Sequence, residues 1–312
     1  MSPAPKISVL IPAYNCARFL PEAIDSVLMQ DFGDFELIVS DDRSSDGSVD
    51  LLRRYAGRDP RLRLHFQASN LGMVAHWNWC LQQARGDYVK FVFGDDLLTS
   101  GGTLGRLAGR LDADPGIALV ATARVVLDES SRPVGRWNDL AAGRHRGREL
   151  IARCLLEDRN LIGEPSAVLF RRAAAGRGFD AQWRQLMDLE MWFHLLAAGD
   201  LDYVPEPLCA FRLHPGQQSA ANRRANVGPE DRLRLFARYA AHLPADAAAR
   251  RALFRCLYYS FHYAPKNPET RAAQSALLAR LTRRRYGLYW LRHRLTKPFL
   301  NLARRARRED GP

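Results

Sequence analysis

The sequence predicts an α/β fold, in which a mostly parallel β-sheet carries helices on its faces and a helical appendage follows at the C-terminus. Between residues 7 and 93, short apolar runs alternate with segments whose apolar residues recur at helical spacing. This alternation is typical of a parallel sheet joined by right-handed helical crossovers. After Asn226 the strand patterns disappear, and Ala, Leu, Arg and Tyr dominate. We therefore expect one domain over residues 1–225 and a helical, basic extension over residues 226–312.

The expected elements follow one another in a regular order. Strands are expected at residues 7–11, 35–40, 62–66 and 88–93, and the helices between them at 19–30, 49–55 and 73–84. Pro21 fits the first helix because proline is tolerated in a first turn. Later helices are expected at 103–111, 149–156 and 185–198. Residues 117–126 are expected to form one or two strands, and short strands are expected at 167–170, 201–204 and 208–213. Residues 128–148 are polar and contain three glycines, so we expect a surface excursion there.

The composition limits the class of protein. With 47% hydrophobic and 26% charged residues, the chain is typical of a soluble globular protein, and no window has the ~18 apolar residues of a spanning helix. The first six residues run into a strand-like segment and lack the long apolar region of a signal peptide. The five cysteines are far apart and form no CxxC pair, so neither a disulfide framework nor a zinc site is expected. A reducing, cytoplasmic setting fits best.

The positive charge is concentrated near the C-terminus. Residues 271–308 contain eleven Arg, one Lys and no acidic residue. Their twelve positive charges equal the net charge of +12, so the rest of the chain is formally neutral. Aromatic and leucine residues between these cations suggest peripheral contact with an anionic membrane surface. A solvated charged helix and a nucleic-acid patch are the alternatives, and no nucleic-acid-binding module is recognisable, so we expect no nucleic-acid partner.

Two pairs of aspartates directly follow expected strands. Asp41 and Asp42 come after the strand at 35–40, and Asp95 and Asp96 come after the strand at 88–93. Each pair could be an ordinary turn that caps the next segment. However, the carboxyl ends of parallel strands open onto one ligand crevice, so we expect the two pairs to converge. Carboxylates at such an edge suit a hard divalent cation that holds a substrate's phosphates.

An ordered set of motifs makes the chain recognisable. It contains SVLIPAYN at 8–15, VSDDRSSDGS at 39–48, NLG at 70–72, ARGDY at 84–88, GDD at 94–96, MDLEMW at 187–192 and FRLH at 211–214. Each motif is weak alone, but together and in this order they resemble the family 2 glycosyltransferases of the GT-A fold over about residues 6–220. The resemblance implies a Rossmann-like sheet and transfer of a sugar from a nucleotide-diphosphate sugar to an acceptor hydroxyl, with inversion.

The resemblance also implies roles for individual residues. Asp95 would ligate a Mg²⁺ or Mn²⁺ ion that bridges the diphosphate, with Asp96 beside it. His214 would approach the metal-diphosphate or close over the donor, and Asp188 would be the catalytic base, with Glu190 as its substitute. The expected nucleotide-sugar-binding residues are Pro12, Ala13, Tyr14, Asp41, Asp42, Asn70, Asp96 and His214.

Two positions depart from the family pattern. Phe93 stands where an Asp usually precedes the metal-binding residue by two positions, and Met187 replaces the Glu that usually precedes the base. We expect weaker or differently arranged metal binding rather than none. The alternative is a catalytically silent nucleotide-sugar-binding or scaffold protein of the same fold.

The biological setting follows from the resemblance as an expectation. The acceptor would be a glycan or a lipid-linked molecule in the synthesis of cell-surface polysaccharide, lipopolysaccharide or glycolipid. The protein would act in the cytoplasm, peripherally at the inner face of the cell membrane. Trp183 could stack on the acceptor, although a place in the core is the stronger interpretation, and Glu164 could touch the acceptor or be an ordinary loop carboxylate.

Overall fold

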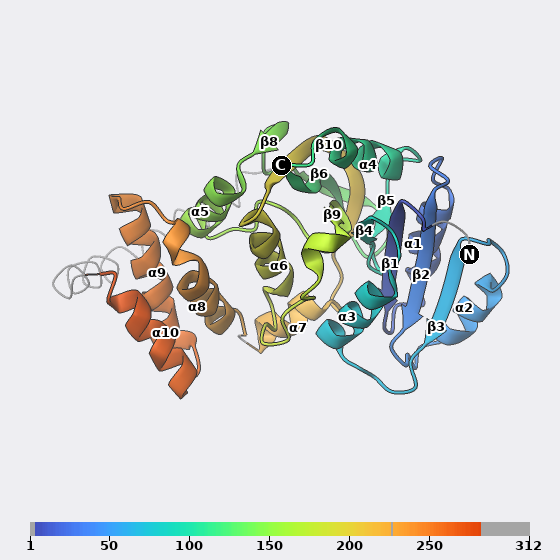
Figure 1. Ribbon diagram of the computed structural model, residues 1–312. Coiled ribbons are helices and arrows are strands. Elements are labelled where there is room, and N and C mark those ends of the chain that lie inside the picture. The colour runs from blue at the N-terminus through green and yellow to red at the C-terminus, as the bar shows by residue number, and fades with distance from the viewer. Residues whose placement is uncertain (1–3, 226, 282–312) are drawn as a thin grey trace. The chain divides into compact units, whose positions relative to one another are not determined.

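The computed structural model describes residues 4–225 and 227–281 (Figure 1). These fall into two compact units. Of the described residues, 4–151 and 159–221 form the first unit, and 152–158, 222–225 and 227–281 form the second.

The first unit is organised around one sheet, in the order β3-β2-β1-β4-β9-β6-β10-β5, with β7 paired to β6 and β8 to β10. The four strands β1 (Ile7–Ala13), β2 (Phe35–Asp41), β3 (Leu62–Phe66) and β4 (Tyr88–Phe91) are parallel. Strand β9 (Val168–Arg171) runs antiparallel between β4 and β6 (Ile117–Leu127), and β10 (Asp200–Arg212) is parallel to β6. The short β5 (Leu97–Leu98), β7 (Pro133–Trp137) and β8 (Gly143–His145) add antiparallel pairs. The expected α/β fold with a central sheet is confirmed, but within the described residues the sheet is mixed: the β3-β2-β1-β4 part is parallel, and antiparallel pairs predominate in the rest.

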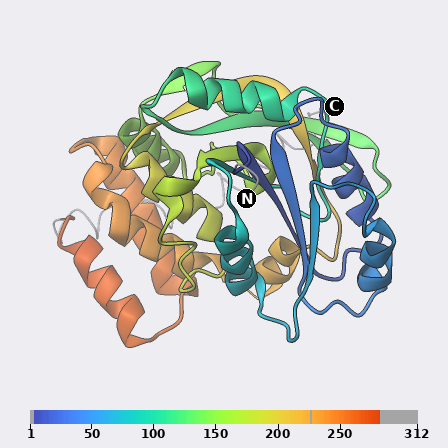
Figure 2. The same ribbon diagram turned by 45° about the vertical axis from the view of Figure 1, so that its right-hand side comes forward.

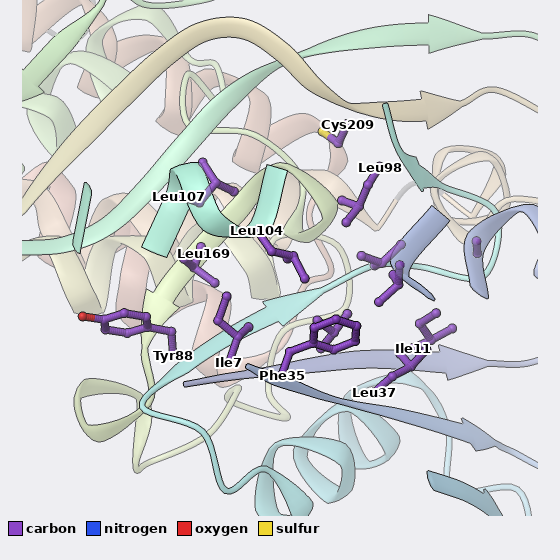
Figure 3. Packing of buried hydrophobic residues seen from close by; sticks show 14 of the residues in the cluster. Ile7, Ile11, Phe35, Leu37, Tyr88, Leu98, Leu104, Leu107, Leu169 and Cys209 are labelled. Carbon is purple, nitrogen blue, oxygen red and sulfur yellow. The ribbon is translucent and has the colours of Figure 1, made fainter. Parts of the chain in front are cut away.

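Helices cover both faces of this sheet. Helices α1 (Leu20–Leu28) and α2 (Ser48–Tyr55) lie on one side of β1–β3, and α3 (Met73–Gln83) lies on the other (Figures 1 and 2). Side chains of β1 and β2, including Ile7, Phe35 and Leu37, share a core with Leu104 and Leu107 of α4 (Thr103–Ala113), as Figure 3 shows. On the opposite face, rings of β4 and β9 pack against those of α3 and of α6 (Met187–Leu196).

Two expectations for the strands are wrong. Residues 128–148 are not merely a surface excursion, because they contain β7 and β8. All residues of β7 are exposed, so this strand is held by backbone pairing to β6 and has no apolar pattern that would reveal it. The two short strands expected at 201–204 and 208–213 are the single strand β10, whose pairing with β6 shifts register on both sides of Pro207. Proline cannot donate to the ladder, which explains the apparent break.

The second unit is helical over its described residues. It contains α8 (Gly228–Tyr239), α9 (Ala247–Tyr263) and α10 (Pro268–Leu278), which bury Phe236, Leu257 and Leu277. Asp246 caps α9 by accepting a hydrogen bond from Ala249 N, and Asn267 caps α10 in the same way from Thr270 N. The expected helical extension is therefore confirmed within 228–278. Helix α5 (Gly147–Glu157) contributes residues to both units, and α7 (Gln218–Arg224) spans the boundary at Asn222.

None of the helices within residues 4–225 and 227–281 combines the length and the apolar character required to cross a membrane. Most of the basic segment 271–308, with its expected membrane contact, lies outside the described residues.

Candidate active site

The two acidic pairs lie at the same edge of the sheet. Strands β2 and β4 both pair with β1, with Asp41 opposite Ala13 and Phe91 opposite Leu10. The segments that follow β2 and β4 therefore leave the sheet at the carboxyl end of β1. Cys16 lies between them. Burial and then the negative charges of Asp95 and, more weakly, Asp41 raise the pKa of its thiol to about 12. The geometry agrees with the convergence that the sequence predicts.

The loop after β1 is tied to the loop after β2. Asn15 accepts a hydrogen bond from Ser45 N through Oδ1, and its own N–H donates to Ser44 Oγ. Asn15 has φ +49°, a conformation in which Asn is tolerated better than most residues. Pro12 and Ala13 are buried in β1, and Tyr14 follows with 56% of its surface exposed. A planar ring is thus presented at the edge, in a loop held by several hydrogen bonds.

Asp41 and Asp42 are both buried but have different partners. The carboxylate of Asp42 accepts hydrogen bonds from Leu71 N at 2.7 Å and Gly72 N at 3.0 Å, and Asn70 Nδ2 donates to the Asp42 carbonyl. Asp42 therefore holds the 70–72 loop against the sheet edge. Asp41 Oδ2 accepts from Ser44 N, whereas its buried Oδ1 has no hydrogen-bond donor among the described residues. This unused acceptor is a candidate partner for a ligand N–H.

Asp95 and Asp96 are neighbours in sequence with opposite environments. Asp95 is partly exposed, and its Oδ2 lies 3.0 Å from Nε2 of His214, the residue that follows β10 by two positions. Asp96 is 1% exposed and accepts hydrogen bonds from Ser166 Oγ and Arg212 N. Burial, reinforced by the charge of Asp95, raises the pKa of Asp96 well above its ordinary value. Asp95 is thus the carboxylate open to a ligand, and direct contact of Asp96 with a donor stays a prediction.

The donor set of Asp95 and His214 fits a divalent cation of the expected kind. Within residues 4–225 and 227–281, no group of three or more His, Cys, Asp and Glu side chains could hold a metal ion by itself. Mg²⁺ is usually bound through one or two carboxylates together with substrate phosphates and water, rather than by an all-protein cage. One carboxylate oxygen and one imidazole nitrogen, both partly exposed and facing each other, match such a shared site.

Arg212 contacts several segments at this edge of the sheet. From the sequence, no role was predicted for it beyond its place in the FRLH motif. It is 0% exposed. Its Nε donates to the Asp95 carbonyl at 2.8 Å, and its Nη2 lies 2.8 Å from Glu22 Oε2 of α1. The guanidinium also stacks over the Phe19 ring. Arg212 therefore fixes the backbone that carries Asp95, and no sequence signal reveals this because its partners come from α1 and from the loop that follows β4.

Asp188 and Glu190 lie in the first turn of α6, as expected. Asp188 is partly buried, and its Oδ1 accepts a hydrogen bond from Leu189 N. Glu190 is 1% exposed and forms an ion pair with Arg177 at 2.7 Å. Trp192 Nε1 donates to the Gly163 carbonyl and so anchors helix α6 to this loop. Ser166, three residues after Gly163, donates through its hydroxyl to Asp96. Glu190 is thus committed to a buried ion pair, and the role of Asp188 as the base stays a prediction.

Phe93 packs against Trp77 with ring centroids 4.7 Å apart, and Met187 is 3% exposed, so both residues that depart from the family pattern fill apolar space. Trp183 is 1% exposed and its indole N–H donates to Asp180, so stacking of this ring on an acceptor is wrong and the core interpretation is right. Glu164 pairs with Arg124 at 2.8 Å and keeps a partly exposed side chain.

A separate cavity of about 890 Å³ lies where β10 and α5 begin. Its lining includes Arg144, Arg146, Gly147 and Asp200. Because β10 starts at Asp200 and His214 follows its other end, this cavity is not part of the candidate site.

Comparison with known proteins identifies the same family as the sequence motifs. The family model described as "Glycosyl transferase family 2" matches residues 8–179, more than half of the chain. The uncharacterized protein MT1568 of Mycobacterium tuberculosis is 33% identical over 67% of each chain. The putative glycosyltransferase EpsE of Bacillus subtilis is 41% identical over 31% of this chain and 35% of its own. A Campylobacter jejuni protein named GalNAc(5)-diNAcBac-PP-undecaprenol beta-1,3-glucosyltransferase is 40% identical over 31% of this chain and 32% of its own.

Solved structures share the fold. TarS residues 1–349 from S. aureus, crystallised with UDP-GlcNAc, superpose with a TM-score of 0.62 at 21% identity, covering 88% of this chain and 79% of TarS. The mannosyltransferase PcManGT from Pyrobaculum calidifontis, in complex with GDP-Man and Mn²⁺, gives 0.53 at 19% identity, covering 89% and 86%. At this identity the likeness shows the fold alone. The matched region covers only about a third of the length of EpsE and of the Campylobacter protein, so the match does not show that this chain shares their activities.

Proposed function

Because this chain belongs to glycosyltransferase family 2, we propose that it moves a sugar from a nucleotide-diphosphate sugar to an acceptor hydroxyl, with inversion at the anomeric carbon. The observation that supports this most strongly is the sheet edge where partly exposed Asp95 faces His214 at 3.0 Å, with the Asp41–Asp42 turn on the other side of β1. The structural neighbours in complex with UDP-GlcNAc and with GDP-Man add support for a nucleotide-sugar donor.

Donor binding is assigned to the loops at this edge. The exposed Tyr14 ring would stack on the nucleobase, supported by Pro12 and Ala13 beneath it. The unused Asp41 Oδ1 and the remaining lone pairs of Asp42 would accept base N–H groups, with Asn70 beside the nucleoside. A Mg²⁺ or Mn²⁺ ion held by Asp95 and His214 would neutralise the charge that develops on the leaving diphosphate. Asp96, through its hydrogen bonds with Ser166 and with Arg212 of β10, would fix the position of the neighbouring Asp95.

The reaction needs a base for the acceptor hydroxyl, and Asp188 is assigned that role. The proton moves to the Asp188 carboxylate as the acceptor oxygen bonds to the anomeric carbon and the bond to the diphosphate breaks. Its position in the first turn of α6 favours the ionised form, because the helix N-terminus carries partial positive charge. The ion pair with Arg177 keeps Glu190 from this role.

The test measures donor hydrolysis, donor binding and transfer separately. We expect the purified protein to hydrolyse one nucleotide-sugar slowly when Mn²⁺ or Mg²⁺ is present, and Asp95→Ala to abolish this turnover. Asp188→Asn is isosteric and should lower transfer by roughly 10²-fold or more while leaving donor binding intact. Unchanged turnover in Asp95→Ala would remove the metal assignment.

A catalytically silent nucleotide-sugar-binding or scaffold protein is the second candidate. It is favoured by Phe93 and Met187, two apolar residues at positions where the family commonly has carboxylates. Wild-type protein that binds donors but turns over none, with or without glycan and lipid-linked acceptors, would support it. A panel of UDP-, GDP- and dTDP-sugars identifies the donor first, because a bound ligand raises the unfolding temperature by mass action.

The acceptor and cellular setting remain proposals. The undecaprenol-linked substrate in the name of the Campylobacter relative supports a lipid-linked or glycan acceptor in cell-surface polysaccharide, lipopolysaccharide or glycolipid synthesis. Such an acceptor would place the protein at the inner face of the cell membrane, where the cations of residues 271–308 would meet anionic lipid.

A further inference from the structure

An aromatic pair with one exposed ring lies where β7 ends beside the end of β10. Trp137 of β7 is 36% exposed, and its ring centroid lies 5.4 Å from that of the partly buried Phe211 of β10. Leu213, two residues after Phe211, is 40% exposed. We call Trp137 and Phe211 the aromatic platform. Large apolar side chains that gather on a surface often mark a binding site.

The platform is held rigidly. The Arg124 guanidinium lies 5.3 Å from the Trp137 ring and is itself buried. Arg124 forms ion pairs with Asp139 at 3.0 Å and with Glu164 at 2.8 Å. Arg136, which precedes Trp137 in β7, donates to the Pro205 carbonyl of β10. A ring fixed in this way loses little conformational entropy when a ligand stacks on it.

The platform is connected to the candidate active site by short stretches of chain. Phe211 directly precedes Arg212, whose N–H donates to Asp96 and whose Nε donates to the Asp95 carbonyl. Glu164, which pairs with Arg124, is two residues before Ser166, the donor to Asp96. Gly163, just before Glu164, accepts the Trp192 indole N–H and so connects this loop to α6, the helix of Asp188. Two short stretches of chain therefore lead from the platform to Asp95 and to the candidate base.

We propose that the aromatic platform binds a sugar ring of the glycan acceptor, so this inference rests on the proposed function. The C–H face of a pyranose packs on an aromatic ring, and its hydroxyls donate to nearby acceptors. Glu164 uses Oε2 for Arg124, which leaves Oε1 of its partly exposed carboxylate for a sugar hydroxyl.

The first experiment observes Trp137 directly. The full chain, labelled with ¹⁵N-tryptophan, is titrated with methyl glycosides of glucose, galactose, mannose and N-acetylglucosamine at millimolar concentrations. Trp137→Phe identifies the Trp137 indole N–H signal by its loss. We expect this signal to shift with at least one glycoside, while the signal of buried Trp183 stays in place.

Variants then test whether the ring itself binds. Trp137→Ala should raise the glycoside concentration at half-saturation by roughly tenfold, with partial recovery in Trp137→Phe. Trp79→Phe, a tryptophan of α3 whose ring packs against His65, is the matched control and should bind like the wild type. Donor-induced thermal stabilisation, measured in parallel, shows that each variant is folded.

The outcomes separate this inference from the proposed function. If donors bind and are hydrolysed but no glycoside moves the Trp137 signal, the platform assignment is wrong and the glycosyltransferase proposal stands. If anionic vesicles of phosphatidylglycerol shift the Trp137 signal and glycosides do not, the platform is a lipid-contacting surface and the inference is likewise overturned. If no donor binds or turns over, the proposed function fails independently of the titration.

Discussion

Single residues at the candidate site are defined by the partners that bury them. Arg212 has no exposed surface, yet its guanidinium is satisfied by the Asp95 carbonyl, Ser131 Oγ and Glu22. A buried cation is tolerated only when it is paired and hydrogen-bonded in this way. Arg212 is therefore a positioning residue, which acts on a ligand through Asp95 rather than by contact.

Replacement of Arg212 should weaken both stability and metal-dependent donor binding. Arg212→Met leaves the Asp95 carbonyl and Ser131 without a donor, and we expect a loss of about 2–4 kcal/mol in the free energy of unfolding. Arg212→Lys keeps the charge but cannot reach three acceptors at once, so binding of donor with Mn²⁺ should still fall. Urea unfolding and donor titration measure the two effects.

Arg132, in the neighbouring loop, provides the control for Arg212. Its side chain is 77% exposed and pairs with Asp128, so Arg132→Met should change stability by no more than about 0.5 kcal/mol. Equal effects of the two substitutions would contradict the positioning role of Arg212.

Lys90 is a second buried cation, located in β4. Its Nζ donates to the carbonyls of Phe91 and Ser166. Burial lowers its pKa from 10.5 to about 8 despite the nearby Cys209 and Asp96. The unfolded chain therefore binds more protons than the folded chain between these two pH values, and stability should rise with pH in that window.

This pH dependence is tested with Lys90→Met. Relative to this variant, the wild type should gain stability from pH 8 towards pH 10.5, by on the order of 3 kcal/mol if the full window is reached. Below pH 8 the difference between the two proteins should be constant. Urea unfolding at several pH values measures it, and a difference that is independent of pH throughout would show that the folded-state pKa is not lowered.

At the scale of elements, the start of the parallel sheet depends on close approach of β1 and β4. A Cβ atom on Gly86, just before β4, would lie 2.6 Å from Ser8 N and 2.7 Å from the Ile7 carbonyl carbon. Buried Glu36 of β2 accepts hydrogen bonds from Ser8 Oγ and Arg85 N at the same place. Burial alone would raise the pKa of Glu36, but these bonds and those from the Arg85 and Arg63 side chains outweigh it and lower the pKa.

Gly86→Ala should therefore separate β1 from β4 locally. Because the obstructing atoms are backbone, the cost is expected at about 1–3 kcal/mol. Gly109 is the matched control, since it is exposed within α4 and a Cβ there meets nothing within 4 Å. Gly109→Ala should stabilise by up to about 1 kcal/mol through helix propensity. Thermal or urea unfolding of both variants gives the comparison, and destabilisation by both would argue against a specific clash at Gly86.

At the scale of the whole molecule, every candidate site residue belongs to the first of the two units. Donor binding should therefore stabilise that unit selectively. In hydrogen exchange with donor and Mn²⁺, we expect slower exchange at residues 12–16, 41–46, 70–72, 94–96 and 212–217. Backbone amides of α9 in the second unit provide the internal control and should exchange at unchanged rates. Uniform protection of both units would contradict a site confined to the sheet edge.

Much of the fold was predictable because the relevant signals are local. Apolar periodicity and turn residues predicted the β1–β4 strands with their helices, and the positions of both acidic pairs. The edge strand β7 was missed because its side chains are all exposed, and β10 was divided in two because Pro205 and Pro207 interrupt its pattern. Such elements are specified by pairing partners rather than by their own sequence.

The sequence by itself determined that two aspartate pairs follow parallel strands and that the motifs of a family 2 glycosyltransferase occur in order. Only the tertiary structure decided that Asp95 is open while Asp96 is buried, and that His214, 119 positions away, faces Asp95. It also decided that Trp137 is exposed and Trp183 buried. The physical reason is that burial and pairing arise between segments far apart in the chain, whereas strand and turn preferences reside in each segment alone.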